Sequence, residues 1–220
     1  MRRGSIGALM MLAALAAAAV ALAGGHEQIK YNAADQAAAR SVTIKRADLT
    51  GATGWAGGVV KPDISAPPSC PGHPVDLSKY VLTGAARSQF RAGTRTVESQ
   101  IELLKTVQMV NGEWKLQVTS PGAIACLRST LAQAAAGSGA RLVSFTKLSF
   151  PRLTSQTLAL RIVLEGQAQG VTVREAVEEV LVGKGRTEIE LTVSDLAAAQ
   201  SAVAADALHY ARVLLARVKA

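Results

Sequence analysis

The 220-residue sequence predicts an α+β protein in which a single, mainly antiparallel sheet of about six strands is covered by helices, an α/β/α sandwich. From residue 80 onward, apolar and polar residues alternate with a period of two, which is typical of strands. The predicted strands and helices come in groups, which favours an α+β fold over a doubly wound parallel sheet. The chain is 49% hydrophobic and 18% charged, so disordered, collagen-like and disulfide-miniprotein classes are excluded.

Residues 1–23 have the pattern of an export signal. Two arginines precede 18 uncharged residues, and the segment ends in Ala21-Leu22-Ala23, with small residues at the positions that signal peptidase recognises. We expect cleavage after Ala23, with an N-terminal anchor formed by residues 5–23 as the alternative. Cleavage predicts a secreted protein. Without cleavage, residues 5–23 would anchor an extracytoplasmic protein to the membrane.

Residues 24–74 are predicted to form an N-terminal helix and a Pro/Gly-rich loop. The helix spans residues 33–44, where Asp35 lies in the first turn and Arg40 near the end, as the helix dipole favours. Residues 51–74 contain five prolines and five glycines, a density that predicts no long regular element. This stretch is either a linker or a long loop held down at Cys70.

Residues 75–220 are predicted to form the α+β domain, beginning with a strand pair. Residues 80–90 and 94–105 are separated by a break at Gly93, which predicts an antiparallel hairpin. In the second strand Val97, Ser99, Ile101 and Leu103 face one way, and Glu98, Gln100 and Glu102 face the other. This alternation predicts a sheet with one solvent-exposed face.

Two helices are predicted to follow this pair. In the first, Val107, Val110, Trp114 and Val118 recur at helical spacing, although Asn111-Gly112 is also a strong turn signal for a further strand pair. The second contains Cys126 and ends at residues 137–139, where Ser138 lies between two glycines.

Four strands and a last helix complete the predicted domain. The strands are residues 141–150, 157–168, 171–182 and 186–194. Residues 197–218 form the helix. Its predicted apolar stripe consists of Val203, Ala207, Leu208, Ala211, Leu215 and Val218.

Cys70 and Cys126 are the only cysteines, and an even pair in an exported protein predicts a structural disulfide. Redox-active thiols would instead lie close together in the sequence, as in C-x-x-C. Closing the loop of 55 intervening residues would stabilise the fold by roughly 4 kcal/mol in the chain-entropy model.

Several short runs occur in a characteristic order along nearly the whole chain after residue 33. They include DQAAAR at 35–40, LTGAARSQF at 82–90, Cys126-Leu127 and GKGRTE at 183–188. In this order they resemble a group of uncharacterised secreted actinobacterial-type proteins and, more distantly, the extracellular sensor domains of mycobacterial serine/threonine receptor kinases and related small lipoproteins. The resemblance implies an antiparallel sheet covered by helices, with a cleft for an unidentified ligand, and it transfers no site residue. Those sensors have two disulfides, whereas this chain has one possible disulfide, no kinase domain and no lipobox cysteine.

The sequence contains no catalytic signature, and it predicts no catalytic residue, no metal site and no cofactor. The histidines, His26, His73 and His209, lack metal-ligand spacing, and no nucleophile elbow or phosphate loop is present. Ser138 is better explained as part of a helix end than as a nucleophile.

Charged and aromatic residues give the candidate binding sites. Arg87, Arg91 and Arg95, near the first hairpin turn, form a possible basic patch for acidic groups at a membrane surface or in the envelope. Trp55 lies in a glycine-rich loop and either packs on the sheet or contacts a ligand. Trp114 is expected in the core.

The main acidic cluster consists of Glu175, Glu178 and Glu179. We expect cross-strand pairing of this cluster with Lys184 and Arg186 rather than a calcium site, because calcium carboxylates usually lie on a loop.

The preferred function is a non-enzymatic binding or sensor-type domain of the cell envelope, which holds a small or lipidic ligand or an envelope component between sheet and helix. Basic residues are dispersed over a chain of net charge +8, so nucleic acid is not an expected partner. The alternatives are an envelope hydrolase or transferase with a dispersed site and a structural interaction domain. A pocket with convergent polar groups and a perturbed titratable residue would favour the enzyme.

Overall fold

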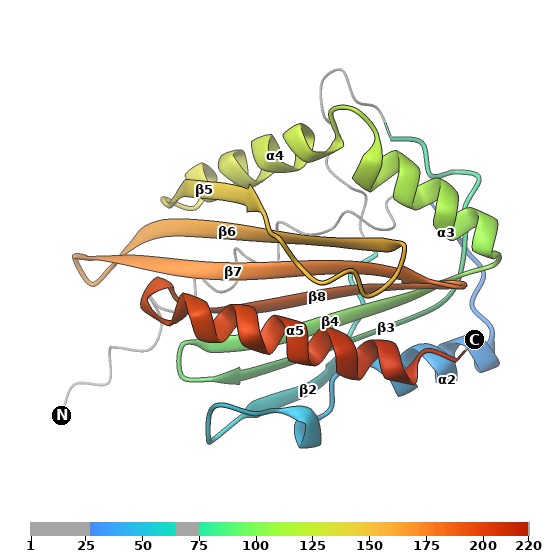
Figure 1. Ribbon diagram of the computed structural model, residues 1–220, viewed down its shortest axis with the longest axis horizontal. Helices are drawn as coiled ribbons and strands as arrows, with labels where there is room; N and C mark the ends of the chain where they lie inside the picture. The colour runs from blue at the N-terminus through green and yellow to red at the C-terminus, as the bar shows by residue number, and fades with distance from the viewer. Residues whose placement is uncertain (1–26, 65–74, 220) are drawn as a thin grey trace.

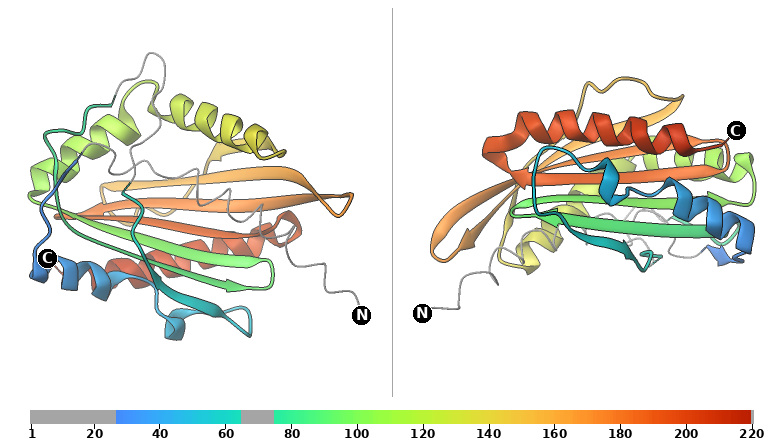
Figure 2. Two further views of the ribbon diagram at one scale, coloured as in Figure 1. Left: turned by 180° about the vertical axis from the view of Figure 1, so that it is seen from behind. Right: turned by 90° about the horizontal axis from the view of Figure 1, so that it is seen from below.

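The computed structural model describes residues 27–64 and 75–219, and it shows one eight-stranded, mainly antiparallel sheet (Figure 1). The strand order is β1-β3-β4-β8-β7-β6-β5, and β2 also pairs with β3. Helices pack on both faces of the sheet (Figure 2). The predicted α+β class with a mainly antiparallel sheet is confirmed, but the sheet has eight strands rather than about six.

The central hairpin consists of β3 (Val81–Ala92) and β4 (Arg95–Leu104). These strands pair antiparallel around Gly93, which adopts φ 61°, a left-handed conformation that glycine tolerates without steric cost. The predicted hairpin is therefore confirmed.

The two additional strands both pair with the outer edge of β3. β1 (Gln28–Ile29) pairs in parallel, and β2 (Ala56–Val60) pairs antiparallel. β2 lies within the stretch predicted to contain no long element. Gly57 makes this strand possible, because a Cβ there would lie 2.1 Å from the backbone oxygen of Gln89.

The second half of the sheet is a meander of four long strands, and its prediction is confirmed. These are β5 (Arg141–Lys147), β6 (Gln156–Ala168), β7 (Val171–Lys184) and β8 (Thr187–Leu196). β8 pairs with β4, which joins the two halves into one sheet.

One face of the sheet is covered by α2 (Ala33–Val42) and α5 (Gln200–Arg217). Both helices are confirmed, although α2 ends two residues earlier than predicted and a 3-10 turn precedes α5. The buried stripe of α5 includes Tyr210 and Leu214, whereas Leu208 and Leu215 are only partly buried. We call this side of the sheet, with its continuous apolar core, the apolar face.

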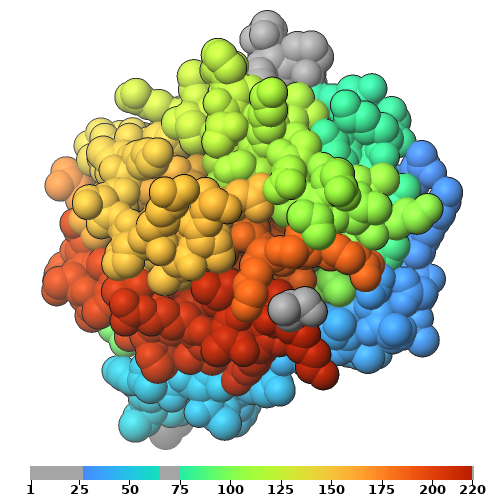
Figure 3. Space-filling view, turned by 45° about the vertical axis from the view of Figure 1, so that its right-hand side comes forward, coloured from blue at the N-terminus to red at the C-terminus, as the bar shows by residue number. Residues whose placement is uncertain are grey.

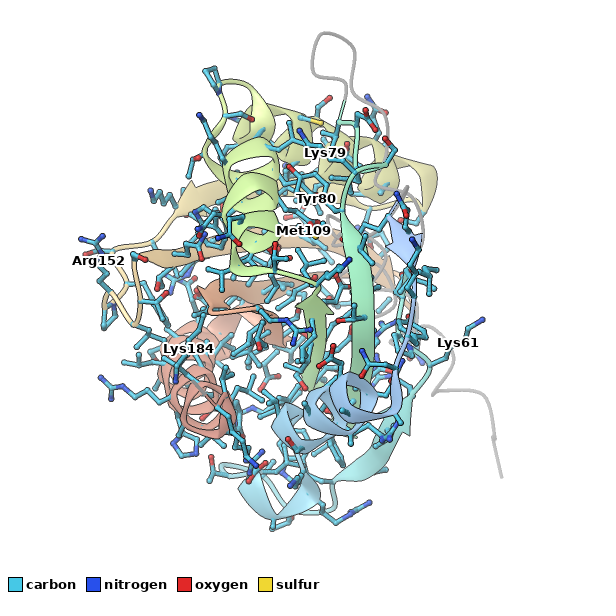
Figure 4. All side chains as sticks on the ribbon, turned by 90° about the vertical axis from the view of Figure 1, so that its right-hand side faces the viewer. Lys61, Lys79, Tyr80, Met109, Arg152 and Lys184 are labelled. Carbon is cyan, nitrogen blue, oxygen red and sulfur yellow. The ribbon has the colours of Figure 1, made fainter. Side chains whose placement is uncertain are left out.

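Polar contacts tie both ends of α5 to the rest of the molecule. Arg217 forms an ion pair with Asp48 at 2.5 Å, and the backbone N–H of Thr50 donates to the Tyr210 hydroxyl over 3.1 Å. Lys184, at the end of β7 next to α5, donates to the backbone oxygen of Val218 (Figure 4).

The opposite face is covered by α3 (Val107–Trp114), a π-helical turn (Lys115–Thr119) and α4 (Ala123–Gly137). We call it the helix-α3 face. In the space-filling view, α3 and α4 form a surface separate from α5, with the β5–β6 connection between them (Figure 3).

The helical prediction for residues 107–114 is confirmed and the alternative strand pair is wrong. The Thr106 side chain caps α3 by accepting a hydrogen bond from the backbone N–H of Met109. Gly112 lies in the helix interior, where a Cβ would be 2.9 Å from the Tyr80 hydroxyl. Figure 4 shows Tyr80 beside α3. Close packing on Tyr80 thus accounts for the glycine that suggested a turn.

Cys126 lies on α4, whereas Cys70 lies outside the described residues, so their disulfide stays a prediction. The predicted export segment, residues 1–23, also lies outside them. Within residues 27–64 and 75–219, no helix is long and apolar enough to cross a membrane.

Candidate functional site

The helix-α3 face carries a row of carboxylate and amide side chains on the two central strands. Pairing of β4 with β8 places Gln100 opposite Glu190 and Glu102 opposite Glu188. Glu98, Gln100 and Glu102 are only 8%, 5% and 2% exposed. The prediction of a solvent-exposed face is therefore wrong, because α3 packs across this end of the sheet.

A cavity of about 50 Å³ lies between α3 and the strands. Its polar lining consists of Gln100, Glu102, Glu113, Gln117, Glu188 and Glu190. Its apolar lining consists of Trp114, Val118 and Leu181, and it is also bordered by Val182 and Ile189, whose side chains belong to the core of the apolar face. At roughly 10–15 Å³ for each water molecule, the cavity has room for about four waters or a ligand of a few non-hydrogen atoms.

Two glutamines orient the two most buried carboxylates of the cavity. Gln100 Nε2 donates to Glu102 Oε1 over 2.9 Å, and Gln117 Nε2 donates to Glu113 Oε1 over 2.5 Å. Gln100 is itself fixed by hydrogen bonds with the backbone N–H and C=O of Asp63. Each amide therefore holds one carboxylate oxygen and leaves the other to face the cavity.

The remaining oxygens are acceptors without a donor. Glu102 Oε2 and Gln117 Oε1 are buried and accept no hydrogen bond within the described part of the chain, whereas the Glu113 carboxyl is hydrogen-bonded to that of Glu27. Buried polar atoms in proteins are normally paired, since leaving one unpaired costs about 1–3 kcal/mol. The cavity thus presents acceptors that a donor-bearing ligand would satisfy.

Burial and mutual repulsion shift the titration of these carboxylates. Burial, reinforced by the charges of Glu188, Glu27 and Glu102, raises the pKa of Glu113 to about 12. Burial and the charge of Glu27 raise the pKa of Glu188 to about 8. Burial likewise raises the pKa of Glu102 well above its ordinary value. At neutral pH the cluster consequently retains protons that a cation could replace.

Positive charge on this face is supplied by Arg87, but it is already paired. Arg87 forms an ion pair with Glu98 at 2.6 Å. Farther along the face, Glu175 and Glu179 are buried, and neither carboxylate oxygen of Glu179 accepts a hydrogen bond from a described residue.

The cavity lining suits organic cations better than metal ions or nucleophilic catalysis. Across residues 27–64 and 75–219, no three histidine, cysteine or acidic side chains converge closely enough to hold a metal ion. The described lining also contains no hydroxyl, thiol or imidazole group. Ammonium N–H groups reach acceptors at about 2.7–3.0 Å, farther than the 2.3–2.6 Å of calcium ligands, and so tolerate a wider arrangement.

The three arginines predicted as a patch are not brought together on one face. Arg87 pairs with Glu98 on the helix-α3 face, whereas Arg95 pairs with Asp195 and Asp206 beneath α5. Arg91 lies on β3 near the hairpin turn.

The two tryptophans occupy different environments. Trp55 is 8% exposed and packs into the core of the apolar face. Trp114, which was expected in the core, packs against the α4 core and also lines the cavity.

The predicted acidic cluster is divided between the two faces of β7. Glu178 pairs with Arg161 at 2.5 Å, whereas Glu175 and Glu179 are buried on the opposite side. Lys184 and Arg186 do not pair with this cluster: Lys184 binds the end of α5, and Arg186 pairs with Asp35. The expected pairing with Lys184 and Arg186 is therefore wrong, whereas Glu178 does pair across strands, with Arg161 of β6.

The remaining candidates lie away from the cavity. The Ser138 hydroxyl donates to the backbone oxygen of Ala135, as expected at a helix end. The ring of His209 packs edge-on against Tyr210, while His26 and His73 lie outside the described residues.

Sequence reasoning missed Glu113, Gln117, Glu188 and Glu190 as cavity residues. The sequence did contain a signal for Glu188 and Glu190. They occupy every second position of one strand, just as Glu98, Gln100 and Glu102 do in another. Two neighbouring strands with the same acidic face repel each other unless protons or cations intervene.

No protein-family model matches the sequence, and no curated protein matches it significantly. The likeness to the sensor-type domains remains an expectation from the sequence.

Proposed function

We propose that this chain is a non-enzymatic binding domain of the extracytoplasmic envelope, of the sensor type, which holds a small cationic ligand in the cavity beneath α3. The observation that carries the proposal is the presence of acceptors without donors, Glu102 Oε2 and Gln117 Oε1, on side chains more than nine-tenths buried. A bound ammonium ion would donate hydrogen bonds to these oxygens, and its positive charge would balance the negative charge of the carboxylates.

The size and chemistry of the cavity favour a small ligand over a lipid. A cavity of about 50 Å³ does not hold an acyl chain, and its carboxylates would remain unpaired against one. Trp114 and the aliphatic side chains offer a surface for the carbon skeleton of an organic ammonium ion, and an indole face attracts cations.

An envelope hydrolase is the second candidate, because two carboxylates with raised pKa values, Glu102 and Glu113, face one cavity. Carboxylate pairs of this kind perform general acid and base catalysis in glycoside hydrolases. The small volume argues against this candidate, since a hydrolase must hold the groups on both sides of the bond it breaks.

Trp114 provides a direct assay, because it lines the cavity and Trp55 is the only other tryptophan. In the mature chain carrying Trp55→Phe, we expect n-butylamine at pH 8 to change the Trp114 fluorescence saturably. Glu102→Gln should weaken this binding by about 10- to 100-fold, the worth of one charge-assisted hydrogen bond.

Glu175→Gln is the matched control, since Glu175 is buried on the same face but does not line the cavity. Its n-butylamine affinity should stay within about twofold of the parent. If neither n-butylamine nor calcium chloride binds, the proposed function is wrong. Hydrolysis of wall glycan that Glu102→Gln abolishes would establish the enzyme instead.

The proposal includes the Cys70–Cys126 disulfide, which would tie the proline-rich loop to α4. We expect the intact mass of the exported chain to be two hydrogens lower than that of its reduced form. Reaction of both cysteines with iodoacetamide without prior reduction would contradict this pairing.

A further inference from the structure

The polar lining of the cavity forms two centres on successive rungs of the β4–β8 ladder. The first rung pairs Glu102 with Glu188, and the second pairs Gln100 with Glu190. Side chains on one face of a strand are separated by two residues, so the rungs lie about 6.8 Å apart. Both rungs belong to the same cavity, which therefore has acidic groups at two points along its floor.

The first centre has the larger excess of acceptors. Glu113 of α3 and Gln117 of the π-helical turn line the same cavity as Glu102, and Glu102 Oε2 and Gln117 Oε1 lack donors among the described residues. The residues that carry these two atoms are 2% and 8% exposed, so bulk solvent does not satisfy them. A group with several N–H donors would satisfy both.

The second centre is Glu190, which lies opposite Gln100 on the β4–β8 ladder and lines the same cavity. Glu179, Glu102 and Glu98 repel a charge on Glu190, and Arg87 is the cation that acts on it. Because Arg87 is engaged with Glu98 at 2.6 Å, Glu190 lacks a cation of its own among the described residues. A second positive group at this rung would balance it.

The wall between the centres is apolar. Leu181 comes from β7, and Trp114 and Val118 come from α3 and the π-helical turn. The side chains of Val182 and Ile189 pack in the core of the apolar face, on the other side of the sheet. Methylene groups can lie against such a wall, whereas a hydrated metal ion would be poorly solvated there.

We infer that the ligand of this cavity is a linear aliphatic diamine of about four carbons, with one ammonium group at the Glu102–Glu188 rung and the other at Glu190. This inference rests on the proposed function and specifies its ligand. An extended chain of four methylenes separates two nitrogens by about 6 Å, given bonds of ~1.5 Å, which matches the rung spacing.

The test compares 1,4-diaminobutane with n-butylamine by calorimetric titration of the mature chain at pH 8. We expect the diamine to bind at least tenfold more tightly, because only the diamine reaches both centres. Glu190→Gln should reduce that advantage to about twofold, because it should weaken the diamine about fivefold more than it weakens n-butylamine. Glu102→Gln should weaken the binding of both amines.

The outcomes separate this inference from the proposed function. Equal affinities for the two amines, or equal weakening of both by Glu190→Gln, would overturn the diamine while preserving a cationic ligand. If calcium ions bind and neither amine does, the diamine is likewise overturned, while the proposal of a cationic ligand stands. Failure of all three probes would overturn both proposals. Circular dichroism of each variant verifies that the fold is retained.

Discussion

The free energy of unfolding is expected to decrease as the pH rises from about 5 to about 8, and Glu179→Gln should remove a large part of this decrease. Glu179 is fully buried on β7, and neither of its carboxylate oxygens accepts a hydrogen bond from a described residue. Burial raises the pKa of Glu179 to about 8.

The sign follows from proton binding. In the unfolded chain the Glu179 carboxyl has its ordinary pKa of about 4.3, so between pH 5 and 8 the folded state holds a proton that the unfolded state has released. The contribution of Glu179 to stability is greatest below its pKa in the unfolded chain, and it is lost as the pH rises through its pKa in the folded protein. A shift of this size corresponds to at most about 5 kcal/mol.

Urea unfolding of the mature chain at pH 5, 6.5 and 8 measures this dependence. Glu165→Gln is the control, because Arg174 and Arg141 lower the pKa of Glu165. The free energy of unfolding of that variant should decrease between pH 5 and 8 as much as that of the unmodified protein. An unchanged pH slope in Glu179→Gln would show that Glu179 is ionised in the folded protein.

Gly84→Ala should destabilise the protein by about 3 kcal/mol, at the upper end of the usual cost of overpacking. Gly84 lies on β3 directly beneath α2, and a Cβ there would be 2.5 Å from the backbone carbon and oxygen of Asp35. The obstruction is backbone, so α2 must move away from the sheet. This movement would also disturb the Asp35–Arg186 ion pair.

Gly58→Ala is the matched control, since a Cβ at this strand position meets nothing within 4 Å. Its effect on the free energy of unfolding should remain within about 0.5 kcal/mol. Chemical denaturation of the two variants tests the comparison. Equal stability would mean that α2 does not pack as closely on β3 as described.

Most of the fold could be predicted because its long elements carry strong patterns. The four strands from β5 to β8 and the helix α5 bury regular apolar residues, and their positions follow from periodicity alone. β1 and β2 could not be predicted in this way. β1 has two residues, and β2 reads Ala-Gly-Gly-Val-Val, whose pairing depends on the edge that β3 offers rather than on its own sequence.

The cavity illustrates a different limit of sequence reasoning. Alternation correctly divided β4 into two faces, but periodicity cannot distinguish a polar face in water from one beneath a helix. The distinction depends on where α3 packs, and Asn111-Gly112 made even the helical nature of that segment ambiguous. Glu102 and Glu113 come together only because α3 lies across β4 and β8.

The long separation in sequence between α5 and its partners constrains the order of folding. Arg217 and Asp48 are 169 residues apart, and Tyr210 bonds to Thr50 across 160 residues. These contacts form only after α5 has been synthesised, and such non-local contacts form slowly. A nascent chain that has been synthesised only as far as β8 lacks the helix that covers the apolar face of the sheet, so this face stays uncovered until α5 is made.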